Sequence, residues 1–118
     1  MSAPVVGDAA HQGNSRAVEI LERSGGRLEV TGALTFATAR KARQQGLHLL
    51  SVSSVRELEV DCSGVTASDS AGLAVLLDWL ASARQRKRSL KLSNLPAPIR
   101  AVAQISDVTE MLEAGVRV

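Results

Sequence analysis

The sequence is poor in aromatic residues, and this shortage limits what the protein can bind. Its 118 residues include one Trp, one Phe and no Tyr, so Leu, Val, Ile and Ala must fill the hydrophobic core. Proteins that bind nucleic acid usually combine a concentrated basic face with aromatic side chains that stack on bases. Because this chain lacks those side chains and its net charge is only +2, we expect no nucleic acid partner.

Cysteine and histidine are equally scarce. Cys62 is the one cysteine, so no disulfide can form within the chain and a reducing compartment is expected. The two histidines, His11 and His48, are too far apart in sequence for metal-ligand spacing. We therefore expect no metal and no other cofactor.

Long apolar runs are missing as well. The longest, Ala71–Leu77, stops at Asp78 and falls far short of the ~18 residues that a membrane-spanning helix needs. The first residues do not place a charged segment before an apolar one, so no signal peptide is predicted. The expected location is the cytoplasm, peripheral to a membrane only where a partner holds the protein there.

The composition that remains fits one globular domain behind a short tail. Residues 1–15 are small and polar without periodicity, which predicts a flexible N-terminal tail. Residues 16–118 are enough for a single domain with one core. No internal repeat or low-complexity segment divides them.

Apolar spacing predicts four strands and four helices. The predicted strands are 18–22, 27–31, 58–62 and 90–92, and the predicted helices are 36–50, 70–84, 97–105 and 108–114. A glycine turn makes the first two strands a hairpin, and the helix between the second and third strands requires parallel pairing by a right-handed crossover. This ββαβαβα(α) order predicts an α/β domain, a mixed four-stranded sheet with helices packed on it.

Several helix ends carry suitable capping residues. Thr35 is suited to cap the helix over 36–50, and Asp107 with Glu110 fits a capping box for the last helix. The basic run Arg84–Arg88 follows the second helix, where cations are favoured by the helix dipole, so we interpret it as a cap first and a binding patch second. The face of the first helix expected to enter the core consists of Phe36, Ala39, Leu47 and Leu50.

The start of the second helix is the most informative stretch. A buried strand leads through a predicted loop over 64–69 into Ser68-Asp69-Ser70, where the helix begins. A helix start exposes unpaired N–H groups and a partial positive charge, and Asp69 or Ser68 as N-cap would contribute about 1 kcal/mol. Capping alone does not exclude a further role in binding.

This second helix has two apolar faces. Leu73, Leu76, Leu77 and Leu80 form one face, suited to docking on the sheet, and Gly72, Val75 and Trp79 form a second. Asp78 is the one charged residue between Ser70 and Ala83. Either a neighbouring helix or a partner must cover the second face, and in so small a domain we favour a partner, with Trp79 as its anchor.

The chain resembles a known family at several of these points. Gly32–Thr35 after the hairpin, the strand 58–62, Asp69–Leu77 at the helix start, and Leu90–Leu95 resemble the STAS domain, the fold of anti-sigma factor antagonists. The resemblance covers roughly residues 16 to 114 and implies a single STAS-like domain that binds another protein.

Two functions are implied by this resemblance. Anti-sigma factor antagonists carry Asp-Ser-Ser-Gly at the helix start, and a partner kinase phosphorylates the Ser before Gly; this chain has Ala71 there. Such antagonists also commonly carry an Asp at the position of Thr35. The stand-alone STAS subunits of Mla-type transporters, the MlaB group, are similar in carrying Asp-Thr/Ser-small-Gly-Leu-Ala, which Asp69–Ala74 fits.

We favour the second function. It implies a non-catalytic subunit that supports the ATP-binding subunit (MlaF-like) of an inner-membrane ABC transporter of phospholipids and so maintains outer-membrane lipid asymmetry. The alternative is an anti-sigma factor antagonist that binds an anti-sigma factor kinase. Ser70 is the candidate regulatory residue, and the expected partner-binding residues are Thr35, Asp69, Ser70, Ala71, Gly72, Leu73, Val75, Leu76, Trp79, Asn94 and Leu95.

Enzymatic activity is not expected. Ser68–Gly72 is close to the Gly-x-Ser-x-Gly motif of hydrolases, but its first Gly is absent. Both histidines precede Ser70, against the order Ser, Asp, His of that fold, and His11 lies in the predicted tail. Nucleotide binding at the helix start stays a weaker alternative, because no Gly-rich phosphate loop supports it.

Overall fold

The computed structural model describes residues 17–117, and over that range the chain forms four strands and four helices. The tail predicted over 1–15, with His11, lies outside the described residues. In chain order the elements are β1 (Val18–Arg23), β2 (Arg27–Leu34), α2 (Ala39–Val52), β3 (Glu57–Ser68), α3 (Ser70–Gln85), β4 (Ser89–Ser93), α4 (Ala97–Ile105) and α5 (Thr109–Ala114). The predicted order of elements is confirmed.

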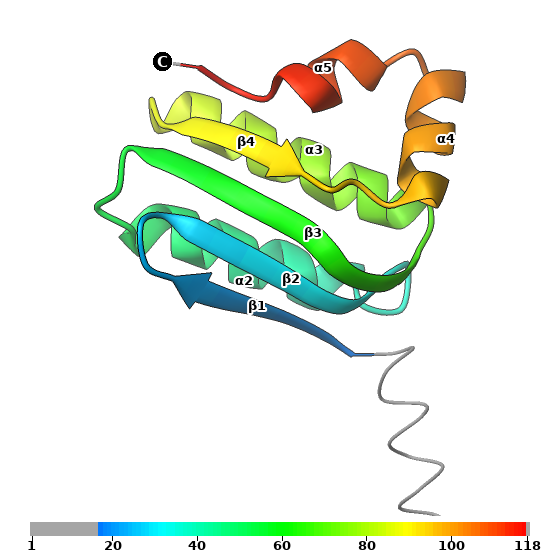
Figure 1. Cartoon of the computed structure of the whole chain (residues 1–118), viewed down its shortest axis with the longest axis horizontal. Helices are drawn as coiled ribbons and strands as arrows, with labels where there is room; N and C mark the ends of the chain where they lie inside the picture. The colour runs from blue at the N-terminus through cyan, green and yellow to red at the C-terminus, as the bar shows by residue number, and fades with distance from the viewer. Residues whose placement is uncertain (1–16, 118) are drawn as a thin grey trace, which may run out of the picture.

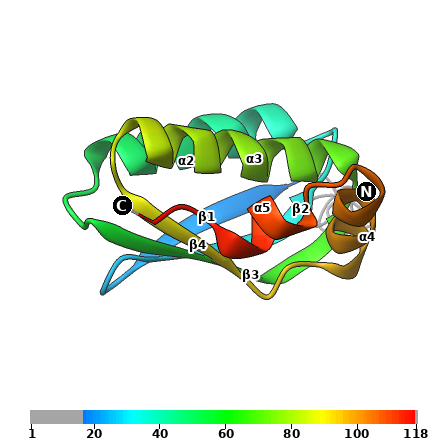
Figure 2. The ribbon, with the colours of Figure 1, turned by 90° about the horizontal axis from the view of Figure 1, so that it is seen from above.

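The strands form one mixed sheet in the order β1-β2-β3-β4 (Figure 1). β1 is antiparallel to β2, while β2 with β3 and β3 with β4 are parallel. Figure 2 shows α2 and α3 together on one face of this sheet, with no helix of residues 17–117 on the other. α4 lies at the end of the domain where α3 begins, and α5 runs beside β4 (Figures 1 and 2).

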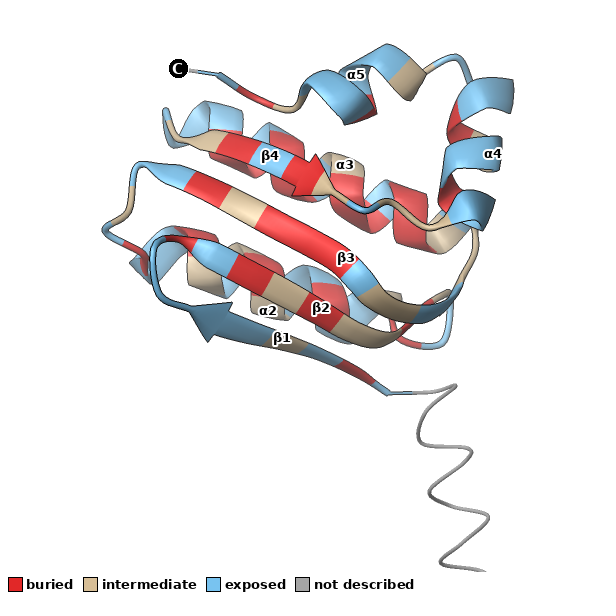
Figure 3. Cartoon of the chain, viewed as in Figure 1, coloured by how far each residue is buried: buried red, intermediate tan, exposed pale blue. Residues whose placement is uncertain are grey.

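The hydrophobic core lies between the sheet and these two helices. Aligned residues of neighbouring strands contribute to it: Leu28 pairs with Val60, and Val60 pairs with Leu92. Figure 3 shows the buried positions following the middle of the sheet and the inner sides of the helices. The largest side chains that are fully buried in it are Trp79, Leu34, Leu50, Leu76, Leu90, Ile99 and Leu112. Aliphatic residues therefore fill most of the core, as the composition predicts, around one Trp.

The start of α2 differs from the prediction. The helix begins at Ala39 rather than at Phe36, and its N-cap is Thr38 rather than Thr35. Thr38 Oγ1 accepts a hydrogen bond from Thr35 N at 3.0 Å and donates one to the Ala33 carbonyl at 2.7 Å. These bonds hold residues 35–38 in a turn, which carries Phe36 out of the predicted core and leaves it 86% exposed.

The end of β3 and the start of α5 also differ. β3 continues to Ser68 through the region predicted as a loop, because parallel pairing with β2 resumes after two register shifts. α5 has Val108 as its N-cap, so the predicted capping box does not form. Asp107 has a positive φ of 62° and closes α4 instead, with Val108 N donating to the Ala103 carbonyl at 2.9 Å.

Within residues 17–117, no helix combines the length and apolarity that crossing a membrane requires.

Candidate functional site

The candidate site is built around the carboxylate of Asp69 at the start of α3. Asp69 Oδ1 accepts hydrogen bonds from Ala71 N at 2.9 Å and Gly72 N at 3.4 Å, so the predicted N-cap is confirmed. Its other oxygen, Oδ2, accepts from Phe36 N at 3.1 Å. One side chain therefore caps α3 and ties it to the turn between β2 and α2.

Gly72 lets the helix start approach the sheet closely. A Cβ at this position would overlap the carbonyl oxygen of Leu34, the last residue of β2. A glycine is therefore required here by backbone contact rather than by its dihedral angles. Because α3 is seated this tightly, the turn at 35–38 and the first turn of α3 form one rigid unit.

Four exposed side chains lie on or next to this unit. Phe36 is 86% exposed, Ala37 lies beside it, and Ser70 and Ala74 face solvent on successive turns of α3. Thr35 and Ala71 are partly exposed between them. We call these six residues the entry surface: Thr35, Phe36, Ala37, Ser70, Ala71 and Ala74. It presents an apolar anchor, a hydroxyl and small side chains, which suits close contact with another protein.

Sequence reasoning missed Phe36, the largest side chain of this surface. Its spacing from Ala39 and Leu50 is that of a buried helical face, so the pattern placed it in the core. The turn that redirects it depends on hydrogen bonds that Thr38 Oγ1 and the Asp69 carboxylate accept from the backbone N–H groups of Thr35 and Phe36. The chain's only Phe, in the segment Thr35-Phe36-Ala37-Thr38, was the one available signal.

The expectation that a partner covers the second face of α3 is wrong. α2 covers that face: the indole of Trp79 packs against Gly46, where a Cβ would overlap the ring, and Trp79 Nε1 donates to the Arg43 carbonyl at 3.4 Å. Trp79 is only 2% exposed, so it anchors the two helices to each other. The predicted contact residues that lie in the core, and so offer no surface, are Gly72, Leu73, Val75, Leu76 and Trp79.

The remaining predicted residues lie at the same end of the molecule. Asn94 and Leu95 form the connection from β4 to α4, which Figure 1 places near the start of α3. Asn94 is exposed, with a positive φ of 55°, and Leu95 is partly buried. The structure therefore brings Thr35, Asp69, Ser70 and Ala71 together, with Asn94 and Leu95 on the adjoining connection.

A buried carboxylate fixes that connection. Asp61 Oδ1 accepts from Asn94 Nδ2 and from Ser63 N, each at 2.9 Å, and Oδ2 accepts from Arg27 at 2.5 Å. The hydrogen bonds from Asn94 and Ser63 hold the pKa of Asp61 well below its usual range. Asp61 thus stays charged and joins β2, β3 and the segment that leads to α4.

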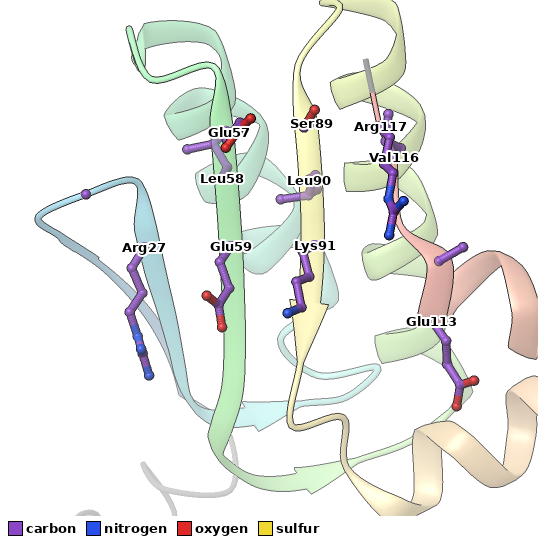
Figure 4. Close-up of a pocket in the computed structure, with 12 residues that line it drawn as sticks. Arg27, Glu57, Leu58, Glu59, Ser89, Leu90, Lys91, Glu113, Val116 and Arg117 are labelled. Atoms are coloured by element: carbon purple, nitrogen blue, oxygen red, sulfur yellow. The ribbon is translucent and has the colours of Figure 1, made fainter.

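The uncovered face of the sheet carries a separate hollow of about 590 Å³. Figure 4 shows Arg27, Glu59 and Lys91 projecting from three neighbouring strands, with Glu113 of α5 beyond them. Their charges alternate in sign across the sheet, so the hollow favours neither an anion nor a cation.

Among residues 17–117, the side chains with the most reactive chemistry, Cys62 and His48, lie on different elements. Cys62 is 1% exposed, and burial raises the pKa of its thiol to about 12, which suppresses the reactive thiolate. His48 lies on α2 and is exposed. Among residues 17–117, no three His, Cys, Asp or Glu side chains cluster as metal ligands would.

A mixed sheet with two helices on one face, and a helix start at the surface close to an exposed Phe, defines the class of α/β domain. Residues 19–113 match the family model described as Mlab, STAS domain. The chain therefore belongs to the STAS domain family, as the resemblance predicts, and its fold is like that of anti-sigma factor antagonists. No curated protein matches the sequence significantly.

Solved structures of the same fold support this assignment. The anti-sigma factor antagonist SpoIIAA in its unphosphorylated form is 15% identical, with a TM-score of 0.58 over 75% of this chain and 83% of that chain. The Bacillus cell fate determinant SpoIIAA in the phosphorylated form is 16% identical, with a TM-score of 0.60 over 80% and 86%. A sulfate transporter family protein from Wolinella succinogenes is 18% identical, with a TM-score of 0.59 over 80% and 76%. At these identities the likeness concerns the fold.

Proposed function

We propose that this STAS domain is the non-catalytic subunit of a Mla-type phospholipid ABC transporter, bound to the transporter's ATP-binding subunit (MlaF-like) in the cytoplasm. The entry surface is the proposed contact. In this function the subunit would be held at the membrane by that partner and by the permease that the partner serves. In this function the subunit supports the ATPase and takes no part in chemistry.

The observation that carries the proposal is the chemistry of the first turn of α3. Ala71 occupies the position at which an anti-sigma factor antagonist would be phosphorylated, and an Ala side chain has no oxygen to receive a phosphate. Thr35 stands where such antagonists commonly carry an Asp, and it likewise supplies no carboxylate for a phosphorylation site at Ala71. The turn keeps its acid, its hydroxyl and its glycine, which supports a fixed contact rather than a phosphorylation switch. The description of the matching family model as Mlab is consistent with this function.

Exposure at the entry surface supports the same function. Phe36 is held in place by the Asp69 carboxylate through its own backbone N–H, so its exposed ring is presented without a large loss of backbone freedom on binding. Ser70, the exposed first residue of α3, directly follows the Asp69 that holds Phe36 N. An aromatic anchor next to small residues is the arrangement that typically contributes most to a protein interface.

The proposal is tested by binding of the purified chain to the MlaF-like ATPase of its own host. Phe36→Ala should weaken binding by about thirtyfold, the effect of losing a typical ~2 kcal/mol interface anchor. Ile105→Ala is the matched control, since Ile105 is 85% exposed on α4, outside the entry surface. Both variants should keep the circular dichroism of the parent.

Equal weakening by the two substitutions, or none by Phe36→Ala, would show that the contact lies elsewhere. A second candidate function, an anti-sigma factor antagonist, is favoured by the fold it shares with SpoIIAA and by the exposed hydroxyl of Ser70. It predicts binding to a serine-kinase anti-sigma factor in place of the ATPase.

A further inference from the structure

Six basic residues gather at the end of the domain opposite the entry surface. We call them the basic end: Arg56, Arg84, Arg86, Lys87, Arg88 and Arg117. They come from the α2–β3 connection, the end of α3 and the segment after α5. Figures 1 and 2 both place these three segments together, away from the start of α3.

Backbone contacts fix this grouping. Ser89 N donates to the Arg56 carbonyl at 3.0 Å, which joins the α3–β4 turn to the α2–β3 connection. Leu90 and Val116 exchange two hydrogen bonds of 2.8 Å, which set Arg117 beside the start of β4. Figure 4 shows Glu57, Ser89 and Arg117 at the same end of their segments.

The charges of the basic end are not neutralised within the described chain. The four ion pairs among residues 17–117 involve Arg23, Arg27 and Arg43, and none involves a residue of the basic end. The three segments contain no acidic residue, and Glu57, the first residue of β3, is the acid that directly follows one of them. The six cations and this one acid together carry more positive charge than the net +2 of the whole chain. The remaining residues of the chain are therefore net negative.

Structural roles account for three of these residues. Arg88 donates to the Val55 carbonyl at 2.8 Å and is partly buried, and Arg86 Nε donates to Ser82 Oγ at 3.3 Å. Arg84 lies in the last turn of α3, where the helix dipole favours a cation. No hydrogen bond or ion pair from the side chains of Arg56, Lys87 or Arg117 is present in the described part of the chain, which leaves their charge available.

An exposed apolar residue distinguishes between classes of anionic partner. Val52, the last residue of α2, is 60% exposed four residues before Arg56. A basic patch with an apolar side chain at its rim suits the headgroup region of an anionic membrane. Nucleic acid is less suited, because the two aromatic residues lie elsewhere: Trp79 is buried, and Phe36 lies between β2 and α2, bonded to Asp69 at the start of α3.

We propose that the basic end is a peripheral binding surface for anionic phospholipid membranes. The surface is separate from the entry surface, so the domain could bind its protein partner and a lipid headgroup layer at once. The binding is electrostatic and reversible, with Val52 making a small apolar contribution. It is a property of this chain alone and does not depend on the identity of the protein partner.

The test is sedimentation of the full chain with lipid vesicles. Vesicles of phosphatidylcholine containing about a third of phosphatidylglycerol should bind the protein at about 0.1 M salt and release it at about 1 M, where the screening length falls from about 10 Å to about 3 Å. Vesicles of phosphatidylcholine alone should not bind it. Arg84→Gln with Lys87→Gln should weaken binding to the anionic vesicles by roughly thirtyfold, since each cation near such a surface contributes strongly.

The matched control removes two exposed cations from α2, by Arg40→Gln with Lys41→Gln, and should leave vesicle binding within about twofold of the parent. Circular dichroism and thermal unfolding of both double variants check that they fold. Equal weakening by the two double variants would show that vesicle binding depends on net charge alone, and this would overturn the proposal. So would salt-independent binding, the absence of binding, or tighter binding to a DNA duplex than to the vesicles.

Discussion

At the scale of single residues, two carboxylates position the parts of this domain that matter for binding. Asp69 caps α3 and holds the backbone of Phe36, and Asp61 holds Asn94 at the connection to α4. Both convert a loop into a fixed surface by accepting hydrogen bonds from a neighbouring segment.

Asp61 gives the domain a predictable acid sensitivity. The pKa of Asp61 is lower in the folded chain than in the unfolded chain, so the unfolded chain takes up the proton first as the pH falls. The stability that this group contributes is therefore present above the unfolded pKa of about 3.9 and is lost as the pH falls below it toward the folded value. Asp61→Asn should reduce the free energy of unfolding by about 2 kcal/mol at neutral pH.

Urea unfolding of the parent and of Asp61→Asn at a series of pH values checks this prediction. The difference between the two proteins should narrow steadily as the pH is lowered below about 4. A difference that stays constant down to the lowest pH would mean that folding does not lower the pKa of Asp61.

At the scale of secondary-structure elements, the packing of α2 against α3 decides which residues are available for binding. α3 is apolar on two sides because it contacts both the sheet and α2, and Trp79 fills the contact between the helices. The glycine at position 46 makes room for the indole. Because these two sides are covered, the proposed entry surface is limited to the first turns of α3 and the turn before α2.

Gly46→Ala tests this packing because two effects of opposite sign compete. Ala is the better helix former by about 1 kcal/mol, which alone would stabilise α2. The added methyl would overlap the Trp79 ring, and overpacking of this kind costs about 1–3 kcal/mol. We expect overpacking to prevail, with a net loss of about 1 kcal/mol in the free energy of unfolding and a change in Trp fluorescence.

Gln44→Ala, at an exposed position of the same helix, is the control and should change stability by less than about 0.5 kcal/mol. A stabilised Gly46→Ala variant would mean that the helices separate easily and that Trp79 is not the anchor between them.

At the scale of the whole molecule, the sequence predicts the architecture better than it predicts the surface. The alternating strands, the hairpin turn and the crossover helix predict the mixed four-stranded sheet, and local capping chemistry predicts Asp69 as an N-cap. The exposure of Phe36 and the burial of Trp79 were not predicted. Each depends on long-range packing: a turn fixed by Thr38 and Asp69, and a glycine on another helix.

The two proposed surfaces also depend on long-range packing. The entry surface and the basic end are each assembled from segments distant in the chain, at opposite ends of α3. The run Arg84–Arg88 was visible in the sequence as a possible patch, whereas Arg56 and Arg117 join it only through the folded sheet. A function that uses both ends needs the intact domain.

Affinity purification of the tagged chain from its native host tests the central claim most directly. The parent should retain an ABC transporter ATPase with its permease, and Ser70→Arg should lose both while keeping its circular dichroism, because a large charged side chain would fill the entry surface. Retention of a serine-kinase anti-sigma factor instead, or an ATPase held equally by the parent and by Ser70→Arg, would contradict the account.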